Sequence, residues 1–212
     1  TLLDNDGNEV TSTPAYAADG TTEIGTYSID PATGQVTFTP TDKSYTGKVT
    51  PVKVQAESSN GIKVDTTYTP EIVPVTPTAT PAETTDIQGA TQTGKPEFKG
   101  GTVTVDGVEK TVEINEAVPA TFDDRSTTKT VDGVGTYTVA ADGTVTFVPE
   151  KSFVGTAPAV TVVREDKNGT KASATYTPTV TPVTPTATAV ETTDIQGATQ
   201  TGKPVFTEGD SR

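Results

Sequence analysis

Short alternating runs of apolar and polar residues, separated by glycine-containing turns, recur along the chain. The run from Gly101 to Glu113 alternates about Asp106 and Gly107, a pair typical of a type I′ hairpin turn. Two further runs, Tyr137–Val139 and Thr144–Val148, flank an Ala-Ala-Asp-Gly turn. Turn signals about 8 to 12 residues apart are typical of a β-sandwich. The pattern therefore predicts many short strands and no helix.

The same turn chemistry appears in both halves of the chain. Val160–Arg164 and Thr170–Val180 flank a turn that ends in Asn168-Gly169. The first half has the corresponding turn at Asn60-Gly61 and another at Thr33-Gly34. Glycine supplies the positive φ that such turns require. Each half is therefore expected to fold by the same series of hairpins.

Composition supports an all-β fold with thin cores. The chain has 48 Thr and 26 Val but only two Leu and seven Ile, together with 19 Gly and 16 Pro. Thr and Val are β-branched, which favours strands over helices. Only 31% of the residues are hydrophobic. The cores are therefore expected to consist of Val, Tyr, Phe and the methyl groups of Thr.

The chain is an internal repeat with an offset of 108 residues. Glu83–Pro96 and Glu191–Pro204 share the sequence ETTDIQGATQTGKP. The middle of the unit recurs less strictly, as in Gly25-Thr26-Tyr27 and Gly135-Thr136-Tyr137. A period of this length is the size of an independent domain, whereas solenoid repeats are shorter. The sequence therefore predicts tandem β-sandwich (Ig-like) repeat domains joined end to end.

Four segments follow from this repeat. They are a first repeat that lacks its N-terminal strand region (1–73), a Pro/Thr linker (74–85), a complete repeat (86–182), and a linker with the opening segment of a third repeat (183–212). The linker is expected either to be extended and polyproline-like or to continue the last strand as an edge strand. Because the chain edges fall inside repeats, we expect a piece of a longer protein.

The mismatched ends suggest two outcomes for residues 1–73. A β domain without its opening strands exposes unpaired backbone groups, and a spare segment of matching sequence can fill the gap by strand addition. Residues 194–212 supply such a segment, so the tail of one chain can complete the first repeat of another. The alternative is a loosely folded first repeat with a disordered tail.

Charge and residue types exclude several function classes. The chain has 15 Lys and Arg against 28 Asp and Glu, a net charge of −13, which disfavours nucleic acid and anionic membranes as partners. It contains no Cys and no His, so it has neither disulfides nor catalytic units built on those residues. Adjacent carboxylates at Asp123 and Asp124 would point to opposite faces of a strand, and on a loop they would simply be solvated, so neither arrangement favours a catalytic pair. We therefore expect no enzyme activity and no cofactor.

Two groups of residues are candidate binding sites. Asp4, Asp6 and Asn8 place oxygen ligands at alternate positions, as calcium loops do, but the position of the distal Glu of an EF-hand loop is Ala15. A solvated turn is therefore the preferred interpretation, and no metal site is expected. The recurring aromatic residues are interpreted as core rather than as a binding strip; they are Tyr27, Phe38, Tyr45, Tyr68, Tyr137, Phe147, Phe153 and Tyr176.

The ordered series of motifs resembles a known family. Residues 135–162 read GTYTVAADGTVTFVPEKSFVGTAPAVTV, followed by Asn168-Gly169 and by ATYTPTVTPVTPT at 174–186. Residues 25–47 and 67–78 carry the same frame. This series resembles the CshA-type fibril repeat of Gram-positive, chiefly streptococcal, surface adhesins. The resemblance implies tandem β domains in a wall-anchored filament, with ligand binding assigned to a separate region.

The expected function is mechanical. The chain is interpreted as a stalk segment of a cell-wall-anchored fibrillar adhesin that projects a distal binding domain from the bacterial surface. Its expected partners are neighbouring repeats of the same chain, with host surface proteins contacted through another region of the parent. The alternative is a repeat that itself binds a host glycoprotein or glycan weakly, with avidity from the array.

Overall fold

The computed structural model describes residues 1–209, and these residues form strands and no helix. The all-β prediction is confirmed. The chain divides into two compact units, of which the first comprises residues 1–77, 100–115 and 165–171. The second unit comprises residues 78–99, 116–164 and, among the described residues, 172–209. These units do not coincide with the sequence repeats, so the boundaries at 73, 86 and 182 stay a prediction.

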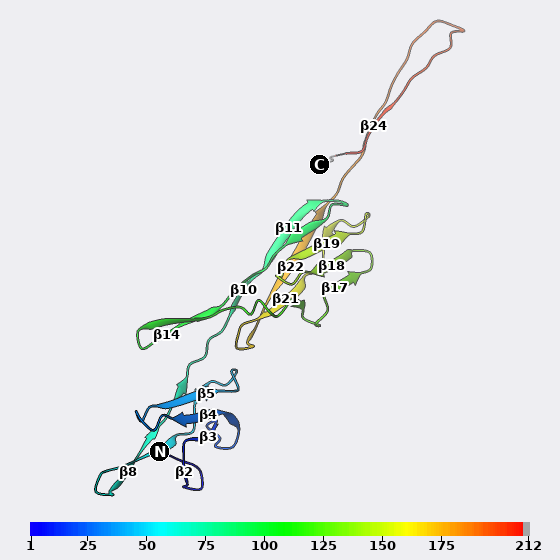
Figure 1. The fold of residues 1–212 in the computed structure, drawn as a ribbon. Coiled ribbons are helices and arrows are strands. Elements are labelled where there is room, and N and C mark those ends of the chain that lie inside the picture. The colour runs from blue at the N-terminus through cyan, green and yellow to red at the C-terminus, as the bar shows by residue number, and fades with distance from the viewer. Residues whose placement is uncertain (210–212) are drawn as a thin grey trace. The chain divides into compact units, whose positions relative to one another are not determined.

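The first unit is built from two main sheets. One sheet has the order β2-β1-β7-β8 and the other has the order β3-β4-β5, while β6 pairs with β9 and β14 pairs with β15 (Figure 1). Strands β8 and β5 are therefore edge strands. The bounds are β1 (Leu2–Leu3), β2 (Glu9–Val10), β3 (Ser12–Tyr16), β4 (Glu23–Ile29), β5 (Val36–Pro40), β6 (Gly47–Lys48), β7 (Val52–Glu57), β8 (Lys63–Tyr68), β9 (Glu71–Ile72), β14 (Gly101–Val105) and β15 (Val108–Val112).

The second unit has two larger sheets. One has the order β11-β22-β21-β16, with β20 also paired to β22, and the other has the order β12-β19-β18-β17. Two further pairs are β10 with β13 and β23 with β24. The bounds are β10 (Thr78–Thr80), β11 (Ala82–Ile87), β12 (Gln92–Gly94), β13 (Glu97–Lys99), β16 (Thr121–Phe122), β17 (Thr128–Val131), β18 (Gly135–Val139), β19 (Val145–Pro149), β20 (Gly155–Thr156), β21 (Val160–Glu165), β22 (Lys171–Thr181), β23 (Thr186–Thr188) and β24 (Val205–Thr207).

The sequence-predicted hairpins are present. Strands β14 and β15 pair about Asp106 and Gly107, whose φ values of 50° and 77° are both positive, as a type I′ turn requires. Strands β18 and β19 pair about the turn that ends at Gly143. Glycines at positive φ also occupy the turns at Gly34, Gly61 and Gly169. Local turn chemistry therefore determines where these strands begin and end.

Strand β10 lies inside the segment that the sequence predicts as a linker (74–85), and β11 begins inside it and ends beyond it, at Ile87. Strand β10 pairs with β13, and β11 pairs with β22. Between β10 and β11 stands Pro81, which cannot donate a backbone hydrogen bond and therefore interrupts the strand there. Strand β11 itself contains no proline and forms the edge of its sheet.

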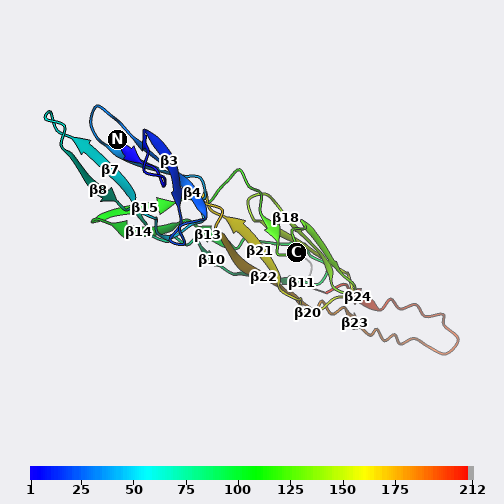
Figure 2. The ribbon, with the colours of Figure 1, turned by 90° about the horizontal axis from the view of Figure 1, so that it is seen from below.

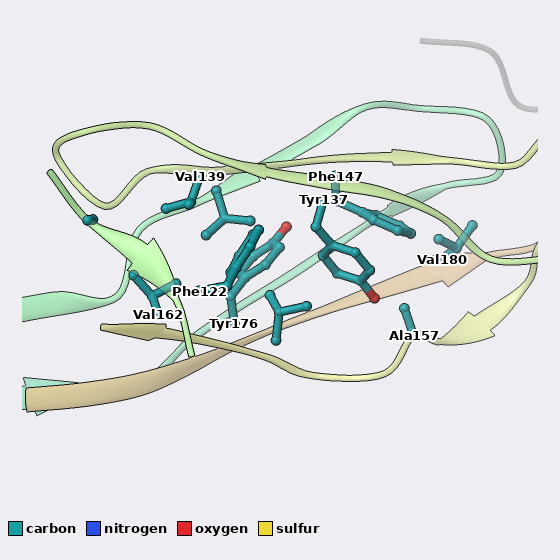
Figure 3. Close-up of a cluster of buried hydrophobic side chains, with 11 residues drawn as sticks. Phe122, Tyr137, Val139, Phe147, Ala157, Val162, Tyr176 and Val180 are labelled. Carbon is teal, nitrogen blue, oxygen red and sulfur yellow. The ribbon is translucent and has the colours of Figure 1, made fainter. Parts of the chain in front are cut away.

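Tyrosine, phenylalanine and valine form the core of the second unit, as composition predicts (Figure 3). Side chains from both main sheets meet there. The rings of Tyr137 and Phe147 have centroids 4.8 Å apart, and the Tyr137 hydroxyl donates to the carbonyl of Pro158 over 2.6 Å. The buried members are Ala120, Phe122, Tyr137, Val139, Val145, Phe147, Ala157, Val160, Val162, Tyr176 and Val180.

The core of the first unit uses the corresponding aromatic residue. Tyr27 is buried, and its hydroxyl donates to the carbonyl of Thr50 over 2.7 Å. Its ring lies 5.8 Å from Phe38 and 6.1 Å from Tyr68, centroid to centroid. The fully or nearly fully buried members are Leu2, Ala15, Ala17, Ile24, Tyr27, Ile29, Val49 and Val52.

Candidate functional site

The opening and closing strands of the second unit lie side by side and run in the same direction. Strand β11 pairs with β22 over six residues, from Ala82 opposite Tyr176 to Ile87 opposite Thr181 (Figures 1 and 2). The amide of Gln88 extends the contact by donating to the carbonyl of Thr181 over 2.8 Å. The first main strand of the unit is thereby joined directly to the last.

A buried polar network joins β22 to residues 82–94, which contain β11 and β12 and are called the opening segment of the second unit. The Thr84 hydroxyl lies 2.6 Å from both the Gln92 Oε1 atom and the Tyr176 hydroxyl. The Gln92 amide donates to the carbonyl of Thr179 over 2.9 Å. Gln92 is only 4% exposed and Tyr176 is fully buried. Buried hydrogen bonds of this kind are costly to break because the partners left behind are unsatisfied.

The ring of Tyr176 fits because residue 94 is glycine. A Cβ atom at Gly94 would collide with the Tyr176 ring and lie 3.2 Å from the Thr84 methyl group. Strand β12, which contains Gly94, pairs with β19 in the other main sheet. The opening segment therefore contributes one strand to each sheet. Burial raises the pKa of the Tyr176 hydroxyl, so this hydroxyl stays neutral within the network.

The direction of β11 and β22 decides how the unit resists extension. The chain enters the ladder at Ala82 and leaves it at Thr181, which lie at opposite ends of the paired region. A pull on the two chain ends therefore slides the strands along each other and loads the whole ladder together. An antiparallel pair would place both ends at one side, where the hydrogen bonds open one after another.

In the first unit, the strands that correspond to β19 and β22 are not covered by a counterpart of the opening segment. The counterparts of β19 and β22 are β5 and the β8–β9 region, and both β5 and β8 are edge strands. Tyr68, the counterpart of Tyr176, is 37% exposed. Phe38 is only partly buried, whereas its counterpart Phe147 is fully buried. The difference in burial marks the surface that an opening segment covers in the second unit.

The candidate calcium residues form a hydrogen-bonded turn between β1 and β2. The Asp4 Oδ1 atom accepts from the amides of Asp6 and Asn8 at 2.9 and 2.8 Å, and its Oδ2 atom accepts from the Asn8 side chain at 3.1 Å. These bonds, the one from the Asn8 backbone first, lower the pKa of Asp4. The Asp4 carboxylate therefore already serves as the acceptor that shapes the turn. Within residues 1–209, no group of three or more Asp, Glu, His or Cys side chains is placed to hold a metal ion.

Asp123 and Asp124 are engaged in surface ion pairs. Lys129 Nζ lies 2.7 Å from Asp123 and 3.6 Å from Asp124, and the Ser126 hydroxyl donates to Asp124 over 2.6 Å. The pKa of each carboxyl is lowered, by Lys129 at Asp123 and by Ser126 at Asp124. A lowered pKa opposes a general-acid role, because the group stays ionised near neutral pH.

The recurring aromatic residues lie mainly in the cores. Tyr27, Tyr137, Phe147 and Tyr176 are buried, whereas Phe38, Tyr45 and Phe153 are partly buried and pack against the cores, and Tyr68 is 37% exposed. The hydroxyls of Tyr27 and Tyr137 donate to backbone carbonyls, and that of Tyr176 bonds to Thr84, so the core interpretation is confirmed for the four buried side chains. Within the described residues, no helix is long and apolar enough to cross a membrane.

The Thr84–Gln92–Tyr176 network was not predicted from the sequence. Its signal was the verbatim repetition of residues 83–96 at 191–204, which contains both Thr84 and Gln92. Repetition identifies the segment but not its partner, because Tyr176 lies 92 residues after Thr84. Only the fold brings these side chains together.

Comparison with known proteins assigns the chain to a family. The family model described as "Surface adhesin CshA repetitive domain" matches residues 1–72 and 74–180. A solved structure, the NMR structure of repeat domain 13 of the fibrillar adhesin CshA from Streptococcus gordonii, is 58% identical. It covers 32% of this chain and 86% of its own, with a TM-score of 0.20. A search of curated proteins found no match. The family match spans most of both sequence repeats, and the chain belongs to the CshA repeat family of fibrillar surface adhesins.

Proposed function

We propose that this chain is a load-bearing stalk segment of a fibrillar adhesin. In this role it acts without catalysis and holds a distal binding domain away from the bacterial cell wall. Its direct partners are the neighbouring repeats of the same parent chain. Membership of a surface-adhesin repeat family supports this location and this role.

The parallel pairing of β11 with β22 is the observation that carries the proposal. The six paired residues form a ladder that tension along the chain loads in shear. The network of Thr84, Gln92 and Tyr176 ties the same two segments together from inside the unit. Tension along the chain therefore acts parallel to the paired first and last main strands, the direction in which all hydrogen bonds of the ladder resist together.

The surface supports a spacer role as well. Ion pairs such as Lys95–Asp142 and Lys99–Glu97 join exposed side chains, so each adds little stability and chiefly keeps the surface polar. The net charge of −13 makes neighbouring fibrils repel one another. The recurring aromatic residues lie mainly in the cores, so their recurrence supports packing rather than glycan binding.

Single-molecule extension of the full chain tests the proposal. The variant Thr84→Ala, combined with Gln92→Ala, removes the buried hydrogen bonds and should lower the force at which the second unit unfolds. The double variant should also lower the free energy of unfolding of the second unit by about 1–3 kcal/mol. The matched control Thr85→Ala changes a neighbouring threonine that is exposed and should leave that force unchanged.

The direction of pull supplies the contradicting outcome. Pulling between residue 82 and residue 181 should require more force than pulling between residue 82 and residue 176, which lie opposite each other in the ladder. Equal forces in the two directions, or unfolding at the lowest measurable force in both, would show that the ladder does not bear load.

A further inference from the structure

We propose that the Pro/Thr segment before the second repeat is a stiff, folded joint rather than a free linker. Residues 75–80 and 97–101, which are called the joint ribbon, form this element, and two residues remain between it and the end of β9. The inference concerns the mobility of residues 73–80. It goes beyond the stalk role, because it holds whether or not the chain bears load.

The two strands of the joint ribbon pair in a fixed register. Strand β10 runs antiparallel to β13 and is hydrogen-bonded to it, with Ala79 opposite Phe98. The side chain of Phe98 packs against the core of the second unit. The ribbon is therefore held by backbone hydrogen bonds between its strands and by an aromatic side chain that anchors it to a folded core.

Two glycines let the backbone of the joint ribbon approach its neighbours closely. Gly101 is buried, and a Cβ atom on it would collide with the carbonyl of Thr76 and lie 2.8 Å from Val75 Cγ1. A Cβ atom on Gly100 would collide with the carbonyl of Val112 at the end of β15. Glycine is the residue that permits such contacts, so a side chain at position 101 would push residues 75–76 away.

Proline restricts the residues that the ribbon leaves free. Val73 and Pro74 lie between the end of β9 at Ile72 and the start of the ribbon at Val75. The ring of Pro74 fixes its own φ at about −65°, and its Cδ atom confines Val73 to extended conformations. Pro77, inside the ribbon, is buried. Few backbone torsions are therefore left to bend the chain at this joint.

The same arrangement recurs 108 residues later in the chain. Strand β23 pairs with β24 in the register of β10 and β13. A Cβ atom on Gly209 would lie 2.8 Å from both the carbonyl oxygen of Thr184 and Val183 Cγ1, which are the counterparts of the two residues that meet Gly101. The ribbon therefore follows from its own local sequence and is a feature of the repeat.

Gln88 holds the chain where it leaves the second repeat. Its backbone amide donates to the carbonyl of Thr181 over 2.8 Å, and its Oε1 atom accepts from the amide of Val183 over 3.3 Å, on the other side of Pro182. Its side-chain amide donates to the carbonyl of Lys151 over 2.9 Å. A single proline therefore separates the last strand of the repeat from the ribbon that follows, and Gln88 bridges it.

Both joints thus differ from a flexible linker in the same way. A flexible linker is a solvated coil whose residues sample many conformations. Here the Pro/Thr segment is paired with a second strand and packed on a glycine, and its remaining residues are restricted by proline. The segments on either side of each joint should therefore tumble together rather than independently.

Nitrogen-15 relaxation of the full chain measures the mobility of the joint. We expect backbone order parameters of about 0.85 at the amides of residues 75–80, as in a rigid strand, whereas a free linker gives values below about 0.6. The variant Gly101→Val should lower these values, because its side chain displaces residues 75–76. The control Thr104→Val changes an exposed residue of the same hairpin and should leave them unchanged.

A second variant covers the case in which Gly101→Val unfolds the β14–β15 hairpin. Val75→Ala removes the methyl groups that lie against Gly101 and leaves the hairpin sequence intact, so it should lower the order parameters of residues 75–76 by a smaller amount. Amide exchange at Tyr137 and Phe147 shows whether the core of the second unit stays folded in each variant.

The variant Gln88→Ala tests the exit from the second repeat. It should lower the order parameter of Val183, because the acceptor of the Val183 amide is removed. The matched control Gln196→Ala changes the same residue of the second fourteen-residue copy, where the side chain is exposed, and should leave Val183 unchanged. Equal order parameters of Val183 in the two variants would contradict the role of Gln88.

Residual dipolar couplings distinguish an ordered ribbon from a stiff joint. Couplings from β3–β5 and from β17–β19 should give alignment tensors of equal magnitude in the unaltered chain. Insertion of Gly-Gly between Val73 and Pro74 should make the magnitudes differ while the order parameters of residues 75–80 stay the same. Order parameters below about 0.6 in residues 75–80 of the unaltered chain overturn the proposal, and so do tensors that already differ in magnitude there.

Discussion

At the scale of single residues, one tyrosine position has two environments in the same chain. Tyr176 is fully buried and bonded to Thr84, while its counterpart Tyr68 is 37% exposed. The residues around the two positions in sequence are alike, reading Tyr-Thr-Pro in both repeats. The difference is therefore set by the opening segment, which covers Tyr176 and contains Gly94.

We expect Gly94→Ala to destabilise the second unit. The new Cβ atom would collide with the Tyr176 ring, and overpacking of this kind typically costs about 1–3 kcal/mol. Denaturant unfolding of the full chain, followed by amide exchange at Val145 and Phe147, measures the effect.

Gly202→Ala is the matched control for that prediction. It changes the same residue in the same fourteen-residue sequence, but its Cβ would meet only the side chains of Val190 and Thr192, at 3.3 and 3.4 Å. Its effect on the stability of the second unit should be close to zero. If both variants lower the free energy of unfolding of the second unit equally, the Tyr176 contact is not the reason that position 94 requires glycine.

At the scale of elements, the sequence predicted hairpins better than it predicted the opening strand. The β14–β15 and β18–β19 pairs follow from turn residues that act locally, such as Asp106-Gly107 and Gly143. Strand β11 has no such local signal, because its pairing with β22 joins positions more than ninety residues apart. Proline-rich flanks made residues 74–85 resemble a linker, and only the partner strand makes part of them a strand.

The candidate site likewise depends on a long-range pairing that the local sequence does not indicate. Residues 83–96 stood out because they are repeated, and the core role of the aromatic residues followed from their recurrence. The bond between Thr84 and Tyr176 could not be predicted, since it depends on the register of a parallel pair. A shift of that register by one residue would turn Thr84 away from Tyr176.

We expect Gly107→Ala to weaken the β14–β15 hairpin. Gly107 has a φ of 77°, which an alanine adopts only at a cost of about 1–2 kcal/mol. Amide exchange at Thr102 and Lys110 should speed up by roughly tenfold. Asp106→Asn is the control, because asparagine suits the φ of 50° at that position. Equal exchange in both variants would show that the turn does not determine this hairpin.

At the scale of the whole molecule, the resolved shifts of acid and tyrosine pKa values lie outside the neutral range. Side-chain and backbone hydrogen bonds from Thr22 lower the pKa of Asp19 to about 2, and the backbone and side chain of Thr144 lower that of Asp142 to about 2. Burial raises the pKa of Tyr27 and of Tyr137 to about 12. The chain contains no histidine.

Stability should therefore be nearly constant from about pH 6 to 9. The contribution of Asp19 and Asp142 is present above their ordinary pKa of 3.8 and is lost as the pH falls through about 2. That of Tyr27 and Tyr137 is present below the ordinary pKa of 10.0 and is lost as the pH rises through about 12.

Thermal and denaturant unfolding at a series of pH values measures this profile. The variant Asp142→Ala should lower the free energy of unfolding on the plateau, because the contribution of Asp142 is then absent at every pH, and it should reduce the further loss of stability in acid. A change in the free energy of unfolding above ~1.4 kcal/mol between pH 6 and 9 would contradict the prediction, since it corresponds to a full pKa unit of differential protonation.

The pairing of the opening strand with the closing strand also sets the order in which the second unit is completed. The Thr181 hydroxyl donates to the carbonyl of Asp86 across 95 residues, so the ladder cannot form until almost the whole unit has been synthesised. Contacts of such long range form slowly and late in folding. Until then β11 has no partner strand, and Tyr176 is not covered by the opening segment. Each emerging repeat is thus open to its neighbours before it closes on itself, and the rate at which the chain emerges decides how long that interval lasts.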